Sequence, residues 1–226
     1  MDIVSGCYEG LPYWSKGSRE GFGPPQLLRD EEGGYMHAGR FWDPETKQHT
    51  SGMLPGMGSL GRAYSALPVD MDGDGDLDLV VGTDSGRLLL RTNIGTKSEP
   101  KFDIKPTLLA GPGGSFGFRD GYAMPVAVDW DGDGAFDLVS GGKSGTISWL
   151  RNVGSNGAPV FAEAAPLVDR AVLARAGVAE RVQVSVADYD GDGHLDLLLG
   201  DNLSEQRGEG YHWHGRVWVM RRVVMQ

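Results

Sequence analysis

One acidic motif of nine residues occurs three times in this chain of 226 residues, and its copies recur with a constant 59-residue period. Every copy has aspartate at positions 1, 3, 5 and 9 and glycine at positions 4 and 6. The copies are Asp70-Met-Asp-Gly-Asp-Gly-Asp-Leu-Asp78, Asp129-Trp-Asp-Gly-Asp-Gly-Ala-Phe-Asp137 and Asp188-Tyr-Asp-Gly-Asp-Gly-His-Leu-Asp196. A constant period predicts stacked copies of one supersecondary unit, so the motif constrains the whole fold.

The repeat extends beyond the acidic motif. Gly82, Gly141 and Gly200 recur with the same period, and so do Asn93 and Asn152. Short apolar runs precede and follow each motif, and glycine, asparagine and aspartate separate them, which is typical of short strands joined by tight turns. Four short strands in one repeat of this length match one blade of a β-propeller. The 36 glycines and 12 prolines also favour turns over long helices.

We therefore predict an all-β fold, a β-propeller of four-stranded blades with about 3.5 repeats in this chain. The whole chain, residues 1–226, is predicted to be a single propeller or a segment of one. Its predicted units are a partial blade at 1–30, an insert at 31–61 and blades at 62–120, 121–180 and 181–226. Because half a repeat does not close a ring, we expect either further blades and a signal peptide from a longer chain, or a homo-oligomer.

Two segments break the period and are predicted to be long loops. Residues 31–61 make the first unit longer than the units that follow, and residues 201–214 lengthen the last hairpin. Long loops on a rigid scaffold often carry binding sites. We therefore expect a protein or carbohydrate ligand to contact these two inserts, where Trp42, Tyr211 and Trp213 offer aromatic rings.

The formal net charge of −10 argues against nucleic acid or an anionic membrane as a partner. No run of 18 apolar residues occurs, so no membrane span is predicted, and residues 1–6 do not resemble a signal peptide. Cys7 is the only cysteine, which excludes an internal disulfide. Much of the acidity is local, because the three motifs contain 13 of the 31 acidic residues.

The acidic motif has the chemistry of a cation site. Four carboxylates this close repel one another unless a cation lies among them, and alternate aspartates with glycine at a tight turn are typical of a Ca²⁺ loop. An EF-hand needs glutamate at position 12, where this chain has Val81, Ser140 and Leu199, and here a strand follows the motif rather than a helix. Two alternatives stay open: an acidic turn without metal, and a Mg²⁺ site, although Mg²⁺ prefers fewer protein ligands.

This motif, which ends in aspartate before a strand, resembles the FG-GAP and VCBS repeats of integrin-α-like β-propellers. The resemblance covers the chain from Asp2 to about Arg222. It implies three Ca²⁺ sites, each bound by the side chains at motif positions 1, 3, 5 and 9 and by the carbonyl oxygen of position 7. The implied metal ligands are Asp70, Asp72, Asp74, Asp76, Asp78, Asp129, Asp131, Asp133, Ala135, Asp137, Asp188, Asp190, Asp192, His194 and Asp196. We also expect an extracellular, periplasmic or cell-surface location.

Two functions fit this resemblance. The first is a non-catalytic, calcium-stabilised module for extracellular binding or adhesion, with neither catalytic nor cofactor-binding residues. The second is a propeller-based carbohydrate-active enzyme of the polysaccharide lyase or sugar dehydratase type, whose chemistry would use the loop residues His37, His49, Tyr211 and His212. We favour the first, because the sequence contains neither a complete P-loop motif nor an H-E-x-x-H motif. The pair His212 and His214 also lacks a third metal ligand nearby in the sequence.

Overall fold

The computed structural model describes residues 2–109, 117–208 and 210–222, so parts of the predicted units 1–30, 62–120 and 181–226 lie outside the described residues. The described strands are β1 Ile3–Ser5, β2 Tyr13–Ser15, β3 Gly17–Ser18, β4 Gly21–Phe22, β5 Gln26–Leu27, β6 Arg40–Asp43, β7 Gln48–Ser51, β8 Ala63–Val69, β9 Asp78–Thr83, β10 Leu88–Arg91, β11 Thr107–Leu109, β12 Met124–Val128, β13 Asp137–Gly141, β14 Ile147–Leu150, β15 Ala165–Val168, β16 Glu180–Ala187, β17 Asp196–Arg207 and β18 Gly210–Met220. An all-β architecture is thereby confirmed, with one short helix, α1 Arg170–Ala176, among the described residues.

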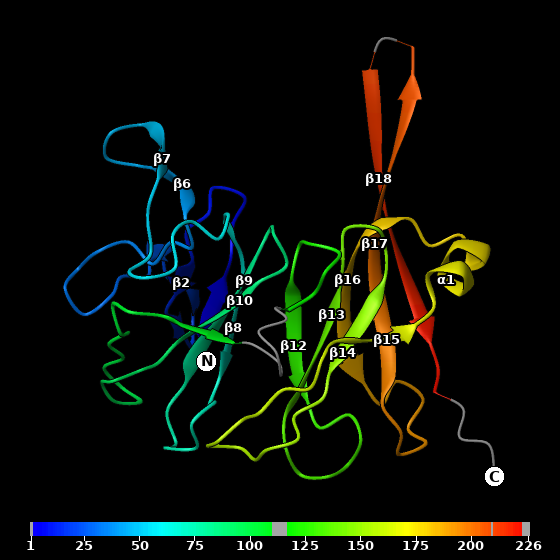
Figure 1. Ribbon diagram of the computed structural model, residues 1–226. Coiled ribbons are helices and arrows are strands. Elements are labelled where there is room, and N and C mark those ends of the chain that lie inside the picture. Colours follow the sequence, from blue (N-terminus) through cyan, green and yellow to red (C-terminus); the bar gives the residue numbers. More distant parts are fainter. Residues whose placement is uncertain (1, 110–116, 209, 223–226) are drawn as a thin grey trace.

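Four antiparallel sheets follow one another along the chain and stand side by side (Figure 1). Their strand orders are β1-β2-β5 in the first sheet, β11-β10-β9-β8 in the second, β12-β13-β14-β15 in the third and β16-β17-β18 in the fourth. The hairpins β3-β4 and β6-β7 are separate two-stranded sheets. Each acidic motif joins the first two strands of its sheet, as in β8-β9, β12-β13 and β16-β17. The described sheets do not close on one another.

The apolar runs after the acidic motifs form strands that are buried on both faces. Every residue of β9 and of β13 is buried, because each of these strands has a neighbouring sheet on either side. A continuous apolar run, instead of an alternating one, is what such a strand requires. The three hydrophobic clusters of the protein accordingly lie between consecutive sheets: the first between the first and second sheets, the second between the second and third, and the third between the third and fourth.

The repeated glycines allow these sheets to approach closely. In the first three sheets, a Cβ atom at the glycine of the repeat would collide with a backbone carbonyl oxygen of the next sheet. The colliding pairs are Gly6 with Tyr64, Gly82 with Ala123 and Gly141 with Val182. Gly200, the fourth glycine of the series, has no atom within 4 Å of the same position.

The insert at 31–61 is long and largely at the surface, but part of it belongs to the core. Met36 and Ala38 are 1% and 0% exposed, and both belong to the first hydrophobic cluster. The buried Arg91 holds this segment, because its guanidinium donates to the carbonyl oxygen of His37 at 3.2 Å and to that of Asp103 at 2.9 Å. The insert therefore adds buried residues to the cluster between the first two sheets, whereas its segments 31–34 and 44–49 are exposed.

The insert at 201–214 also differs from the predicted loop. Its described residues lengthen β17 and β18 into one hairpin, whose ladder continues as far as Arg207 opposite Gly210. This hairpin extends beyond the other sheets (Figure 1). Tyr211 and Trp213 are 67% and 58% exposed on it. Strand pairing continues here because the backbone groups of the extra residues satisfy one another across the ladder.

Helix α1 fills the connection between the third and fourth sheets. Asp169 caps its first turn by accepting a hydrogen bond from the Ala171 amide, and Gly177 ends it in the left-handed region with a φ of 90°. Leu173, which is fully buried, anchors the helix in the third cluster, where Trp149 and Trp218 also pack. Over the described residues, no helix is long and apolar enough to cross a membrane.

Candidate functional site

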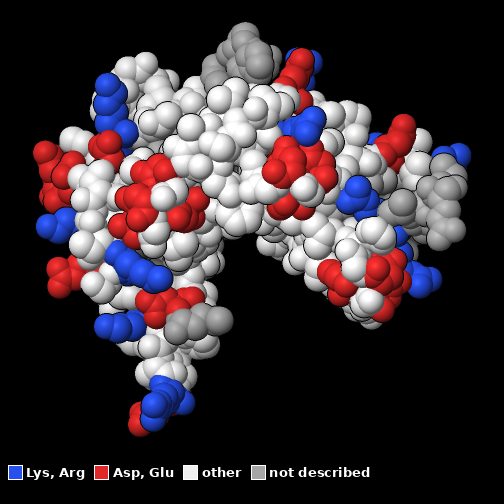
Figure 2. Space-filling model, turned by 90° about the horizontal axis from the view of Figure 1, so that it is seen from below, with Lys and Arg blue, Asp and Glu red and all other residues white. Residues whose placement is uncertain are grey.

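The three acidic loops lie at one end of the sheets. Each loop leaves the end of the first strand of its sheet, so the antiparallel topology places all three at the same edge, the lower one in Figure 1. Figure 2 views this edge directly and shows separate clusters of acidic side chains on it. The repeated loops therefore form a row of similar anionic sites at one edge of the sheets.

The first aspartate of each loop organises the backbone around itself. In the first loop, Asp70 accepts hydrogen bonds from the amides of Gly73 at 2.8 Å and Gly75 at 3.1 Å. Both glycines have a positive φ, of 78° and 97°, which only glycine adopts without strain. The other loops repeat these contacts: Asp129 with Gly132 and Gly134, and Asp188 with Gly191 and Gly193. The glycines are thus required by the loop conformation.

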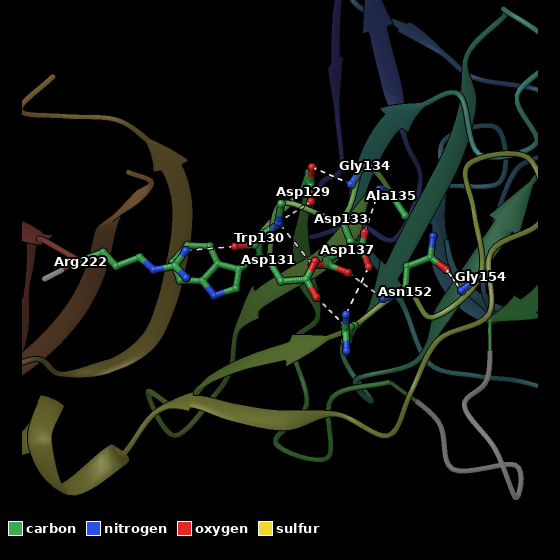
Figure 3. A network of polar contacts seen from close by, with 12 residues as sticks. Asp129, Trp130, Asp131, Asp133, Gly134, Ala135, Asp137, Asn152, Gly154 and Arg222 are labelled. Atoms are coloured by element: carbon green, nitrogen blue, oxygen red, sulfur yellow. Dashed lines mark hydrogen bonds and ion pairs between the residues drawn. The ribbon is translucent and has the colours of Figure 1, made fainter. Parts of the chain in front are cut away.

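The ninth residue of each loop is a buried anchor. Asp137 is 0% exposed, and its two oxygens accept the amides of Trp130 at 3.2 Å and Asn152 at 2.7 Å (Figure 3). The other two anchors do the same: Asp78 with Met71 and Asn93, and Asp196 with Tyr189 and Arg222. Burial raises the pKa of Asp137, and these backbone hydrogen bonds only partly oppose the shift.

The asparagines continue the network into the next turn. Asn152 accepts the amides of Gly154 and Val160, both at 3.0 Å, and Asn93 accepts those of Gly95 and Lys101 in the second sheet. The two asparagines recur with the period of the repeat, and the structure shows that they make equivalent hydrogen bonds. The asparagine side chain holds the turn that follows the third strand, and the backbone amide of the same residue donates to the ninth aspartate of the acidic loop.

Each loop brings at least three carboxylates together. One oxygen from each of three aspartates lies within 4.8 Å of the others, so each group could hold a metal ion. The groups are Asp70, Asp72 and Asp74; Asp129, Asp131 and Asp133; and Asp188, Asp190 and Asp196. The remaining predicted side-chain ligands, Asp78, Asp137 and Asp192, lie in the same loops but outside these groups. The full predicted ligand sets stay a prediction.

The first loop contains a further indication of a cation. The Oδ1 atom of Asp76 is buried and has no hydrogen-bond partner among the described residues. Burial raises the pKa of Asp76, and the neighbouring Asp74, Asp72 and Asp70 raise it further. A buried carboxylate oxygen without a donor is costly, and a cation among these oxygens removes that cost. The residues present therefore fit a hard divalent ion.

Two arginines near the loops were not anticipated from the sequence. Arg151 forms ion pairs with Asp131 at 2.5 Å and with Asp133 at 3.3 Å, and Arg221 pairs with Asp190 at 3.3 Å. Both follow the third strand of their sheets, and no motif marked them in advance. These guanidinium groups partly neutralise the second and third loops, so they would compete with a bound cation for the same oxygens.

The raised pKa values give cation binding by these loops a testable pH dependence. Calcium needs ionised carboxylates, and Asp78 and Asp137 take up protons at a higher pH than ordinary aspartates because burial raises the pKa of both. We therefore expect calcium affinity, measured by calorimetric titration, to fall from about pH 7 to about pH 5. In EDTA the effect of pH on stability has the opposite sign. At pH values between the ordinary and the raised pKa, the folded state binds more protons than the unfolded state. These two groups therefore stabilise the folded state more as the pH falls.

The variant Asp137→Asn serves as the control, because it removes one of the carboxylates whose pKa is raised by burial. Its calcium affinity should depend less steeply on pH than that of the wild type. An affinity that is constant between about pH 7 and about pH 5 would show that these carboxylates do not take part in calcium binding.

The histidines proposed for catalysis lie on different parts of the fold. His37 stacks on Phe41 with ring centroids 5.0 Å apart, and its Nδ1 atom is buried without a hydrogen-bond partner among the described residues. Burial lowers the pKa of His37, and so favours the neutral imidazole. His49 lies on β7 beside Trp42, and His212 is exposed on β18. The described structure therefore does not assemble these histidines into one site.

A groove lies at the opposite end of the sheets from the acidic loops. Its volume is about 340 Å³. It is lined by Tyr64, Tyr122, Met124, Arg181, Gln183, Gly200, Asp201 and Asn202. Tyr64 lies on β8, Met124 begins β12, and Tyr122 lies just before that strand. The other lining residues lie on β16 and β17. Asp201 and Asn202 belong to the second predicted insert, whereas no lining residue belongs to the insert at 31–61.

Aromatic rings and one guanidinium group define the chemistry of this groove. The rings of Tyr64 and Tyr122 meet edge to face with centroids 4.8 Å apart. The Arg181 guanidinium lies 5.9 Å from the Tyr122 ring centroid and 5.8 Å from that of Trp213. Asp201 contributes little free charge, because Arg216 pairs with it at 2.9 Å. The groove therefore combines apolar ring faces with a positive charge.

Backbone strain coincides with the groove. Tyr122 and Arg181 occupy equivalent positions of consecutive repeats and have φ values of 50° and 54°. Non-glycine residues rarely adopt this region, and strained residues persist where the surrounding structure over-determines them, often at binding sites. Both residues with this conformation line the groove.

A model described as an FG-GAP-like repeat matches the chain twice, over residues 70–140 and again over residues 129–199. The two matches together span all three acidic loops and cover more than half of the chain. Comparison with curated proteins and with solved structures found no match to this chain.

Proposed function

Because the chain belongs to the FG-GAP-like repeat family, we propose that it is a non-catalytic β-propeller module, stabilised by calcium, that binds an extracellular ligand. The observation that carries the proposal is the repeated geometry of the three acidic loops. Each loop wraps glycine amides around its first aspartate, buries its ninth, and gathers carboxylate oxygens within 4.8 Å of one another. Three copies of one geometry are hard to explain without a shared ligand.

In this proposal the side chains at motif positions 1, 3, 5 and 9 and the carbonyl oxygen of position 7 hold the ion. Calcium accepts six to eight oxygen ligands in flexible geometry, which suits a loop with this many oxygens better than the strict octahedron of Mg²⁺. The bound charge would neutralise the loop and cross-link the first two strands of each sheet. Affinities of about 10⁻⁴–10⁻³ M, which are typical of extracellular modules, would keep the sites filled outside the cell.

Counting bound calcium tests this proposal. Equilibrium dialysis against radioactive calcium should give three ions per chain, and a tenfold excess of Mg²⁺ should displace little of it. The variant Asp131→Asn should reduce the count to two, because Asp131 is held in the described structure by an ion pair with Arg151, and its loss removes a ligand without unfolding the loop. A count of zero in the wild type would refute calcium stabilisation.

For the ligand, we place the site in the groove at the opposite end of the sheets. Tyrosine rings pack against the C–H faces of sugars, and the amides of Gln183 and Asn202 match sugar hydroxyl groups. Arg181 matches a carboxylate, which a guanidinium binds in a bidentate manner. The geometry therefore favours a carbohydrate that carries a carboxylate, such as a uronic acid. Binding is favoured over catalysis, because the histidines lie elsewhere.

Replacement of Arg181 by glycine separates binding from stability. The left-handed φ of Arg181 costs a non-glycine residue about 1 kcal/mol, and glycine would relieve this strain. The greater flexibility of glycine in the unfolded chain destabilises the folded state by a similar amount. We expect Arg181→Gly to change the free energy of unfolding by no more than about 0.5 kcal/mol. Its affinity for an oligogalacturonate should nevertheless fall about tenfold or more, measured by calorimetric titration.

The matched control is Arg207→Gly, which removes an exposed arginine from the tip of the β17-β18 hairpin, away from the groove. It should bind the oligogalacturonate as the wild type does. If Arg181→Gly retains full affinity, or if only a neutral oligosaccharide binds, the carboxylate assignment is wrong while the calcium proposal is unaffected.

A further inference from the structure

The long hairpin of β17 and β18 brings two histidines to one face. His212 and His214 occupy alternate positions of β18, so their side chains project on the same side of the ladder. The pairing of β17 with β18 has no register shift, and it places Glu205 opposite His212 and Leu203 opposite His214. The two histidines therefore share their face with the glutamate on the neighbouring strand.

Glu205 supplies a carboxylate within reach of both histidines. It lies directly opposite His212, and its Oε2 atom is 3.7 Å from the Nε2 atom of His214. Directly opposed residues have Cβ atoms about 4.5–5.5 Å apart, and diagonal neighbours are still within reach of long side chains. The histidine pair lacked a third ligand in the sequence because Glu205 lies on the other strand, and only the strand pairing brings it close.

The face that carries the histidines is the one that packs on the third sheet nearer the base of the hairpin. There Leu199 and Trp218 lie on the same face and belong to the third hydrophobic cluster. Because the hairpin extends beyond the other sheets (Figure 1), the glutamate and both histidines are exposed above this cluster. The opposite face, on which Val217 is 79% exposed, takes no part in this arrangement.

We propose that Glu205, His212 and His214 bind a divalent metal ion that prefers nitrogen ligands, such as Zn²⁺ or Cu²⁺. Imidazole suits these ions, whereas calcium prefers oxygen ligands. Zinc sites in proteins use two imidazoles and one carboxylate, with water in the open position. In the described structure the ligand atoms of the three residues do not all lie within 4.8 Å of one another, so binding requires these exposed side chains to turn toward the ion. The inference does not rest on the calcium or carbohydrate proposals.

Arg207 is the group that competes with the ion. Its guanidinium pairs with the Oε2 atom of Glu205 at 3.1 Å, which is the same oxygen that approaches His214. Both partners of this ion pair are exposed, with side chains 61% and 45% accessible. An ion pair between exposed side chains contributes little to stability, so a metal ion displaces it at small cost.

The first test is calorimetric titration of the intact chain with Zn²⁺ in saturating calcium, which competes for the carboxylates of the acidic loops. The wild type should bind one Zn²⁺ ion. His212→Gln, His214→Gln and Glu205→Gln should each raise the dissociation constant about tenfold or more, because even the partners behind metal ligands contribute this much. His49→Gln is the matched control: His49 is also exposed on a hairpin, but Trp42 lies opposite it instead of a carboxylate. It should bind Zn²⁺ as the wild type does.

The second test identifies the ligands by electron paramagnetic resonance of the chain loaded with equimolar Cu²⁺. The spectrum should show coupling to two nitrogen atoms in the wild type and in His49→Gln, and to one in His212→Gln. These substitutions change exposed side chains and leave the strand pairing intact, so the variants should fold. The proposal is overturned if the wild type binds no Zn²⁺, if either histidine variant or Glu205→Gln retains full affinity, or if His212→Gln keeps two nitrogen ligands.

Discussion

Addition of about 1 mM calcium to the metal-free protein is expected to raise its free energy of unfolding by about 4 kcal/mol. Each site with a dissociation constant of about 0.1 mM contributes about 1.4 kcal/mol at this concentration, and the three loops act together. For a domain of this size the gain corresponds to a rise in the melting temperature of about 10 °C. Thermal unfolding followed by circular dichroism, in EDTA and in calcium at one protein concentration, measures the shift.

The structure suggests a control within the same loops. Asp131 and Asp190 lie among the clustered carboxylates, and their described side-chain contacts are ion pairs with Arg151 and Arg221, so their loss leaves the backbone turns intact. Asp131→Asn should therefore melt like the wild type in EDTA and lose about a third of the calcium-induced shift. Equal melting temperatures in EDTA and calcium would mean that the loops are hydrogen-bonded turns that need no metal.

Substitution of Gly141 by alanine is expected to lower the free energy of unfolding by about 3 kcal/mol or more. A Cβ at this position collides with the carbonyl oxygen of Val182, so the third and fourth sheets have to move apart. The cluster between them loses contacts on both sides, including those of Val139 and Ile147, which are fully buried. Urea denaturation in saturating calcium measures the change without interference from metal release.

Gly210→Ala is the matched control, because a Cβ at that strand position meets no atom within 4 Å. Its free energy of unfolding should equal that of the wild type or exceed it slightly, since alanine restricts the unfolded chain. A change of less than about 0.5 kcal/mol in Gly141→Ala would show that the sheets separate without cost, contrary to close packing.

The local features of the fold could be predicted because they repeat. The period placed the acidic loops between strands, and the repeated glycines indicated tight turns, which the positive φ values of Gly73 and Gly75 confirm. The asparagine that recurs after the acidic loop was visible as part of the period, but its hydrogen bonds to neighbouring amides were not. Patterns of this kind depend on contacts within a few residues, which the sequence records directly.

The inserts could not be predicted in the same way. Length alone suggested long loops at 31–61 and 201–214, yet the first also supplies buried Met36 and Ala38 to a cluster between sheets, and the second extends a strand ladder. Arg91, which is distant in the sequence, helps to fix the conformation of the first insert. The pairing of β17 with β18 fixes the conformation of the second. Such contacts leave no periodic trace in the sequence.

The sequence by itself determined the family, the repeated strand units and the three clusters of carboxylates, because each depends on residues close together in the chain. Only the tertiary structure decided which end of the sheets carries the groove, how Arg181 comes to lie near Tyr122 and Trp213, and which apolar faces stay open. The physical reason is that side-chain proximity across sheets depends on how the sheets pack. A valine at position 217 is the same residue whether a neighbouring sheet covers it or leaves it exposed.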